Sequence, residues 1–165
     1  MRLDWMRGVV MAAALAFGLF AGGVAEAAPK DGQKFGDWVA RCGKSKDSEC
    51  ILNQIQTVDG GVRLLEIAFG RIGSKGEFGV STIVPLGTFL PANILMAVDG
   101  KEYTLTLIKC LQNGCMAVAP LDNATIEALR KSKQIVIGLM QEVGRKSVSI
   151  AVSPIGLADG LAAIK

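Results

Sequence analysis

The sequence predicts an all-β fold, either an antiparallel β-sandwich or a partly open barrel of about 8–9 strands, with one short helix at about 122–131. Three observations support this prediction. Runs of alternating apolar and polar residues recur along the chain, glycine-containing turn signals separate them, and an Asp-Gly dipeptide joins the clearest two. Residues 28–165 have a length typical of one domain, so we expect a single β domain.

The clearest hairpin signal lies in the middle of the chain, at Ile94–Cys115. Asp99-Gly100 suits a two-residue type I′ turn, because both central residues need positive φ. This turn sets the register and places Met96 opposite Tyr103. A shift of one residue would turn polar side chains into the core, so the alternation specifies the pairing. The face predicted to be buried carries Ile94, Met96, Val98, Tyr103, Leu105 and Leu107.

Further strands are expected on both sides of this hairpin. In chain order they are Phe35–Cys42, Cys50–Thr57, Val62–Gly70, Glu77–Val84, Cys115–Ala119, Gln134–Gln141 and Lys146–Val152. We expect Trp38 to be a large core anchor. In the strand Val62–Gly70, the core face is the one that carries Leu65, Ile67 and Phe69.

The predicted helix follows the strand Cys115–Ala119. Asp122 or Asn123 caps it, and it runs to about Lys131 with Ile126 and Leu129 facing inward. After Pro154 the chain contains helix-forming residues interrupted by two glycines, so we expect at most a short helix there.

Residues 1–27 have the features of a secretory signal peptide. Arg2 and Arg7 give a positive start, Val9–Phe20 is apolar, and Ala25-Glu26-Ala27 is an A-x-A cleavage site. The alternative, an uncleaved membrane anchor, needs ~20 apolar residues, more than this run provides. We therefore expect export to the periplasm, with surface exposure or secretion as further destinations, and no stable membrane anchor once the signal is removed.

The charge of the chain is only mildly positive. It contains 18 Lys and Arg against 15 Asp and Glu, a formal net charge of +3. The one dense cluster, Arg130-Lys131-Ser132-Lys133, fits a solvated helix end better than a patch for nucleic acid or anionic lipid. We expect no nucleic-acid partner.

Four cysteines in an exported chain indicate two disulfides. Sequence alone does not choose among the three connectivities. We favour Cys42–Cys50 and Cys110–Cys115, because each pair lies at the end of a predicted strand and across a short polar loop. A redox-active pair is the alternative, but neither spacing is C-x-x-C and the chain has no histidine. The missing histidine also argues against zinc, so we expect no metal and no cofactor.

Pro85–Pro91 interrupts the strands, because proline cannot donate a hydrogen bond to a ladder. This segment carries three large apolar residues, Leu86, Phe89 and Leu90. They form either a lid over one end of the core, the interpretation we favour, or an exposed apolar patch that contacts a partner. In the second case these three residues are the candidate partner-binding loop.

The residues suited to catalysis are few. Without histidine, neither a Ser-His-Asp nor a Cys-His arrangement can form. Asp37, Glu66, Asp99 and Asp122 are candidate carboxylates, but each fits a turn, a cap or a solvent-facing position, and nothing pairs two of them as acid and base. The sequence predicts no catalytic residue and no enzyme.

Several motifs, in this order, resemble the invasion-associated locus B family of bacterial exported proteins. They are Phe35-Gly36-Asp37-Trp38 before Cys42, Cys50 with Gln54, Val84-Pro85-Leu86-Gly87, Leu90-Pro91, Val98-Asp99-Gly100, Cys110 with Gly114-Cys115, and Leu121-Asp122. The resemblance covers about Phe35 to Ile164. The tail departs from it, since Ser153-Pro154-Ile155-Gly156-Leu157 stands where the family tends to have Ser-Leu-x-Gly-Phe. The resemblance implies an all-β envelope domain, an association with host-cell invasion or colonisation, and no catalytic residues.

Three functional hypotheses follow. The leading one is a non-enzymatic periplasmic or surface protein that binds an envelope or host protein through the loop at 86–91. The second is a binder of a small apolar or envelope-derived ligand held between the sheets, because the inward faces are rich in Leu, Ile, Met and Val. The third, held as least favoured, is an enzyme that uses carboxylates alone on peptidoglycan or other glycans.

Overall fold

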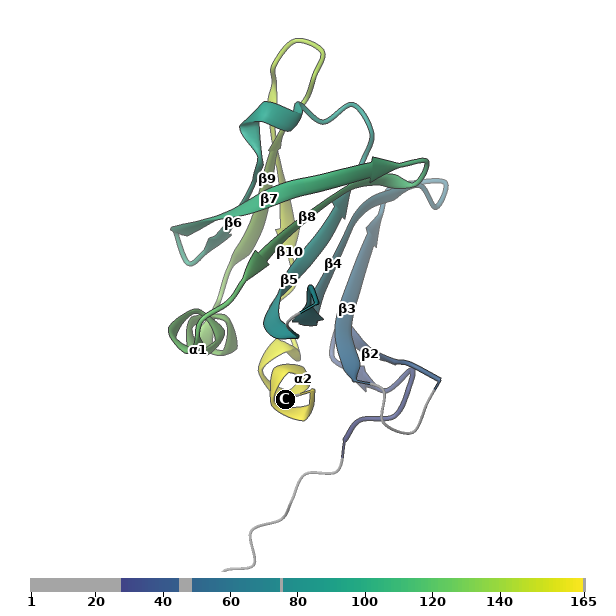
Figure 1. The fold of residues 1–165 in the computed structure, drawn as a ribbon, viewed down its shortest axis with the longest axis vertical. Helices are drawn as coiled ribbons and strands as arrows, with labels where there is room; N and C mark the ends of the chain where they lie inside the picture. The colour runs from purple at the N-terminus through teal and green to yellow at the C-terminus, as the bar shows by residue number, and fades with distance from the viewer. Residues whose placement is uncertain (1–27, 45–48, 75, 165) are drawn as a thin grey trace, which may run out of the picture.

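A computed structural model describes residues 28–44, 49–74 and 76–164. Ten strands and two α-helices make up this part of the chain (Figure 1). The strands are β1 (Lys34–Phe35), β2 (Trp38–Cys42), β3 (Cys50–Thr57), β4 (Arg63–Ile72), β5 (Glu77–Val84), β6 (Ile94–Val98), β7 (Lys101–Leu111), β8 (Gly114–Pro120), β9 (Ile135–Met140) and β10 (Ser147–Val152). The helices are α1 (Asn123–Lys131) and α2 (Leu157–Ala163), and Leu90–Ala92 forms one 3-10 turn, η1. The predicted signal peptide, residues 1–27, lies outside the described residues.

The central hairpin forms as predicted. β6 and β7 pair with Met96 opposite Tyr103 and Val98 opposite Lys101. Both turn residues have positive φ, 48° at Asp99 and 87° at Gly100, as a type I′ turn requires. The Asp99 carboxylate also accepts hydrogen bonds from two backbone N–H groups beyond α1, which ties this turn to the start of β9.

Two details of the predicted architecture are corrected. The segment Phe35–Cys42 is not one strand, because Gly36, at φ 55°, turns the chain and makes β1 and β2 a small hairpin. A side chain at Gly36 would meet the backbone of Ile155, so this tight turn leaves room for the C-terminal segment. The strand count is therefore ten rather than about 8–9. The short helix α2 forms after Pro154, where at most a short helix was expected.

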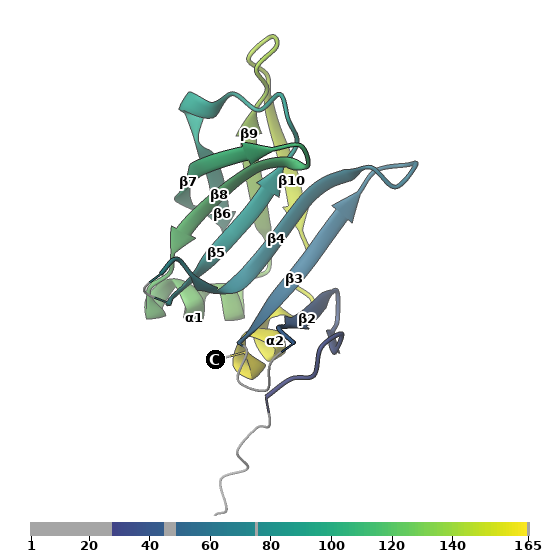
Figure 2. The same ribbon diagram turned by 45° about the vertical axis from the view of Figure 1, so that its right-hand side comes forward.

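All ten strands belong to one open antiparallel sheet. Their order is β1-β2-β3-β4-β5-β8-β7-β6-β9-β10. The sheet curls over, so that β6, β9 and β10 lie behind β4, β5 and β8 (Figures 1 and 2). This arrangement fits the predicted partly open barrel, with a single core between the two layers.

Two glutamine side chains of β3 form hydrogen bonds to the end of β10, where the curled sheet brings its two layers together. The Gln56 amide donates to the Ala151 carbonyl oxygen at 2.6 Å. Gln54 accepts from the backbone N–H of Ser153 at 3.1 Å and donates to its carbonyl oxygen at 3.3 Å. Side chains thus replace the backbone ladder that would close a full barrel.

The core is apolar and continuous between the layers. Trp38 is fully buried, as predicted, with its ring 5.3 Å from that of Phe69. Its indole N–H donates to the Ser153 carbonyl oxygen at 2.9 Å, which satisfies the one polar atom of the side chain. The largest fully buried side chains are Trp38, Phe69, Leu52, Leu65, Ile67, Ile94, Met96, Leu105, Leu129, Ile135, Ile137 and Leu157.

The lower end of the molecule, as drawn in Figure 1, is closed by the two helices and by the β1–β2 hairpin. Asp122 caps α1 by accepting from the Thr125 N–H at 2.7 Å, and Ile126 and Leu129 face inward as predicted. α2 packs so closely that a side chain at Gly160 would lie 2.5 Å from Leu52. No described helix has the length and apolar character needed to cross a bilayer.

Candidate functional site

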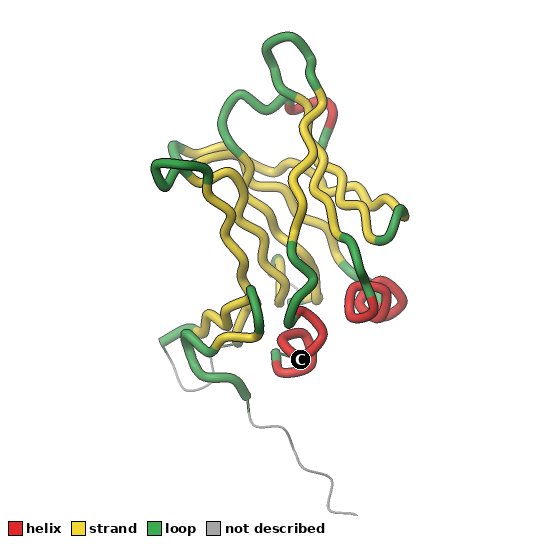
Figure 3. Tube along the Cα trace, turned by 180° about the vertical axis from the view of Figure 1, so that it is seen from behind, coloured by secondary structure: helices red, strands yellow, loops and turns green. Residues whose placement is uncertain are grey.

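The upper end of the molecule carries the loop predicted to contact a partner. This loop connects β5 to β6 and lies beside the turn between β9 and β10 (Figures 1 and 3). Leu86 is 58% exposed and Leu90 is 48% exposed, whereas Phe89 is half-buried. The two leucines therefore face solvent and do not form the lid that the sequence analysis favoured.

Backbone hydrogen bonds hold the two upper segments together. The Phe89 N–H donates to the Met140 carbonyl oxygen, and the Glu142 N–H donates to the Gly87 carbonyl oxygen, both at 2.7 Å. Thr88 is buried and its hydroxyl donates to the Pro85 carbonyl oxygen at 2.8 Å. The loop is thus fixed in shape, although it is not part of the main sheet.

Arg145 covers the one aromatic ring of this region. Its guanidinium lies 3.4 Å from the centre of the Phe89 ring, and it also contacts the Glu142 carboxylate at 3.4 Å. Cation–π contacts of this kind are worth about 0.5–1 kcal/mol at exposed sites. Phe89 therefore has a local packing role and is less accessible to a partner than its leucine neighbours.

Val143 also belongs to this region, although it is not among the site residues predicted from the sequence. It stands at the tip of the β9–β10 turn and is 86% exposed. The signal was present, because an apolar residue in the middle of a predicted hairpin turn, between Glu142 and Gly144, has no core to enter. We call Leu86, Leu90 and Val143 together the apolar rim.

Three hollows lie at or near the apolar rim. One, of about 490 Å³, is an open hollow between the two upper loops, with Leu86 and Val143 among its lining residues. A second, of about 320 Å³, is on the outer face of β6, β9 and β10, with Leu95, Val136 and Gly138 among its lining residues. The third is a cleft of about 90 Å³ between the layers, lined by Leu64, Pro85, Leu86, Gly87, Thr88, Leu139, Gln141, Val148 and Ile150. The interior otherwise is filled by the core side chains, so the space between the layers is small.

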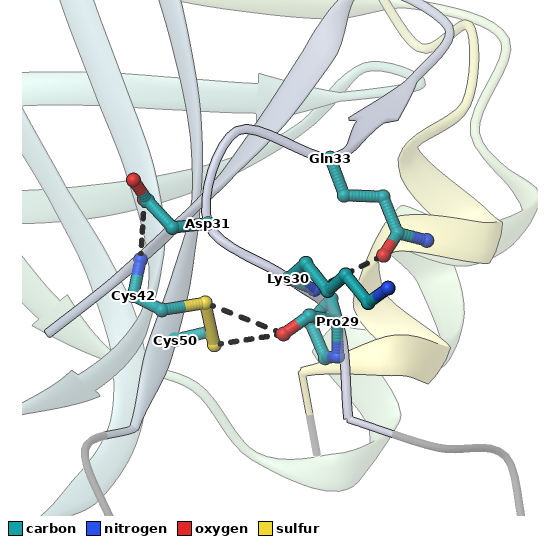
Figure 4. The surroundings of a disulfide bond; sticks show 6 residues. All are labelled: Pro29, Lys30, Asp31, Gln33, Cys42 and Cys50. Atoms are coloured by element: carbon teal, nitrogen blue, oxygen red, sulfur yellow. Dashed lines mark hydrogen bonds between the residues drawn. A yellow bond between two sulfur atoms is a disulfide. The ribbon is translucent and has the colours of Figure 1, made fainter. Parts of the chain in front are cut away.

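Both disulfides have the favoured pairing. Cys42–Cys50 and Cys110–Cys115 each join residues directly opposite each other in a hairpin. The first is covered by the N-terminal segment, whose Pro29 carbonyl oxygen lies 3.5 and 3.6 Å from the two sulfurs (Figure 4). Short loops of this kind contribute only about 2–3 kcal/mol each, so their main effect is to fix local shape.

Each candidate carboxylate has a structural partner. Asp37 accepts from the Ser153 hydroxyl at 2.5 Å, and Glu66 pairs with Arg63 at 2.7 Å. Asp99 fixes the turn described above, and Asp122 caps α1. The hydrogen bonds from Thr125 lower the pKa of Asp122 below its ordinary value of 3.8. Among the described residues, no group of three His, Cys, Asp or Glu side chains is placed to hold a metal ion.

The family model of the invasion associated locus B (IalB) protein matches residues 38–165. Among solved structures, the fold is similar to the crystal structure of invasion associated protein B from Bartonella henselae, with a TM-score of 0.70 at 18% sequence identity. The match covers 80% of this chain and 94% of that chain. No curated protein matches the sequence.

Proposed function

Because this chain belongs to the invasion associated locus B family, we propose that it is a non-enzymatic protein of the bacterial envelope, in the periplasm or at the cell surface, that binds another protein through its apolar rim. The family name motivates a link to invasion or colonisation of host cells. The observation that carries the proposal is that Leu86, Leu90 and Val143 face solvent on segments held rigid by backbone hydrogen bonds.

Covering the apolar rim with a partner would contribute to the free energy of binding. Fully burying a valine or leucine side chain contributes about 1.5–3 kcal/mol, and all three rim residues still have much of that surface exposed. A loop that is already fixed in shape loses little conformational entropy when a partner covers it. Exposed apolar side chains on neighbouring rigid loops are typical of an interaction surface.

The test removes the three apolar side chains of the rim and leaves the core residues unchanged. In the variant Leu86→Ser, Leu90→Ser and Val143→Ser, capture of envelope neighbours by a photo-crosslinker placed at the exposed position of Pro91 or Gln141 should be lost, while the melting temperature stays close to that of the native protein. Phe89 is left unchanged because it packs under Arg145. The matched control is Ile55→Ser with Ile108→Ser, which removes two exposed apolar side chains elsewhere on the sheet. If the rim variant captures the same neighbours as the control, the proposal fails.

A second candidate is binding of a small apolar ligand, and the hollow of about 320 Å³ on the outer face of β6, β9 and β10 favours it. This volume lies within the range of ligand pockets, about 300–1,000 Å³, whereas the cleft between the layers is below it. A side chain at Gly138 would make only ordinary contacts, the nearest being 3.7 Å from Leu95, so Gly138→Leu should fill the hollow and preserve the fold. Native mass spectrometry of protein from its own compartment should show a bound mass that this variant lacks.

A further inference from the structure

β10 is the last strand of the sheet, and only the lower part of its free edge is covered by other groups. At its lower end, Gln56 and Gln54 bind the backbone groups of Ala151 and Ser153. At its upper end, Ser147 and Ser149 are exposed and no described strand pairs with them on that side. An uncovered strand edge is a template for pairing with another chain.

The alternation of hydrogen bonds along β10 shows which groups are free. Ala151 and Ser153 direct their backbone groups away from β9, towards the glutamines. The carbonyl oxygen of Lys146, by contrast, accepts from Gln141 on the β9 side at 2.9 Å. Because the direction reverses at each residue, the N–H and C=O groups of Ser147 and Ser149 point to the open side. Pairing there would leave the β9–β10 ladder intact.

The small cleft between the layers lies beside this free edge. Val148 and Ile150 of β10 line it, and Leu64 of β4 faces them. β3 and β10 are joined at the glutamines and diverge towards the upper end, where the barrel is open (Figures 2 and 3). The cleft volume of about 90 Å³ suits one apolar side chain and is too small for a drug-sized molecule.

We propose that this edge binds the C-terminal segment of a partner protein, which adds as an antiparallel strand beside Ser147 and Ser149 and places one apolar side chain in the cleft. Strand addition supplies affinity through backbone hydrogen bonds and specificity through the side-chain pocket. An antiparallel strand ends beside the start of β10, where Arg145 and Lys146 are exposed. Arg145 is paired with Glu142, but Lys146 has no ion pair among the described residues, so it complements a terminal carboxylate.

A second copy of the chain is a poorer occupant of this edge. Two β10 strands paired symmetrically about Ser149 would set Ser147 opposite Ala151. The Ala151 carbonyl oxygen already accepts from Gln56, and β3 lies beside it. The inference rests on the proposed function only in requiring a protein partner, because Leu90 and Val143 do not line the cleft.

The test uses a short peptide of alternating threonine and valine with one leucine, made once with a free C-terminal carboxylate and once with a C-terminal amide. The acid form should bind the native protein and slow hydrogen exchange at the Ser147 and Ser149 amides. Ser149→Pro removes only an outward N–H, which an edge strand tolerates, and should weaken binding about tenfold or more. Ser149→Ala keeps the backbone donor and should bind like the native protein. Lys146→Gln should abolish the preference for the acid over the amide.

The outcomes separate this inference from the proposed function. Leu90→Ser with Val143→Ser should keep peptide binding even if it loses envelope capture. Equal binding by Ser149→Pro and the native protein would overturn the inference. So would a concentration-dependent dimer that Ser149→Pro abolishes, or binding of octanoate in the cleft without protection of the Ser149 amide while the peptide fails to bind. Should Ser149→Pro not fold, the exchange data on the native protein decide alone.

Discussion

The two ends of the curled sheet use apolar residues in opposite ways. At the lower end, the N- and C-terminal segments pack against each other, and Trp38 and Leu157 are fully buried. At the upper end, Leu86, Leu90 and Val143 remain exposed on two connected loops. Both ends are rich in backbone hydrogen bonds, so rigidity does not distinguish them. What differs is how far the chain itself covers its apolar surface, with Ile155, which is 64% exposed, as the exception at the lower end.

This difference separates stability from binding in one small domain. Burial at the lower end contributes to the free energy of unfolding, because water is excluded on folding. Exposure at the upper end leaves the same kind of surface for a partner. Substitutions at the lower end should therefore change stability, and substitutions at the upper end should change binding.

The largest loss of stability is expected from Gly156→Ala at the lower end. A Cβ there would lie within 2.1 Å of the Phe35 carbonyl oxygen, and φ is 83°. We expect a loss of more than about 3 kcal/mol, measured by urea unfolding. The matched control is Gly32→Ala, with nearly the same φ of 80° and no atom within 4 Å, which should cost only about 1 kcal/mol. Similar losses in both variants would show that the contact with Phe35 is unimportant.

A smaller loss is expected where the sheet closes on itself. Gln54→Leu removes the acceptor for the Ser153 N–H in a buried setting, which should cost about 1–3 kcal/mol. Gln56→Leu removes a bond in more exposed surroundings and should cost less. The measurement is again urea unfolding. Equal losses in the two variants would contradict the expectation that Gln54 contributes more than Gln56 to holding β3 against β10.

A still smaller effect is expected at the cap of α1, and it depends on pH. The pKa of Asp122 is lowered in the folded state, so the unfolded state binds the proton more tightly. The ionised cap therefore stabilises the fold fully above the unfolded-state pKa, near 3.8, and this contribution disappears as the pH falls through the lower folded-state pKa. Asp122→Asn should keep the cap and remove this acid-dependent change in melting temperature. A melting profile in acid that is identical in both proteins would contradict the assignment.

The smallest change in stability should follow from removing two residues of the rim. Leu90→Ser with Val143→Ser should alter the free energy of unfolding by no more than about 0.5 kcal/mol, because Val143 is 86% exposed, Leu90 is 48% exposed and neither belongs to the core. Thermal unfolding measures this directly. A loss comparable with that of Gln54→Leu would mean that the upper end, too, is part of the stabilising core.

Much of the local structure follows from short-range patterns. The Asp99-Gly100 turn fixed the β6–β7 register, because only certain residues accept positive φ at both positions. The Asp122 cap, with Ile126 and Leu129 on one face, located α1. The one strand predicted over Phe35–Cys42 was wrong, because the turn at Gly36 depends on the Ile155 backbone, which lies far away in sequence.

The candidate site was predictable only in part. The proline-bounded segment at 85–91 carries its own signal, and the structure places its leucines in solvent. Whether those leucines would cover the core depended on how the β9–β10 turn packs beside them. The free edge of β10 and the cleft beside it could not be read from residue order, because strand order is set by long-range pairing.

From residue order alone came the antiparallel β class, the hairpin register, the disulfide pairs that we favoured and the place of the first helix, since turn chemistry, alternation and capping act within a few residues. Tertiary structure decided the order of the ten strands, the glutamine-mediated closure of β3 on β10, and which apolar side chains remain in water. The reason is physical: each of these depends on segments about a hundred residues apart meeting in space, and burial is a property of the packed whole.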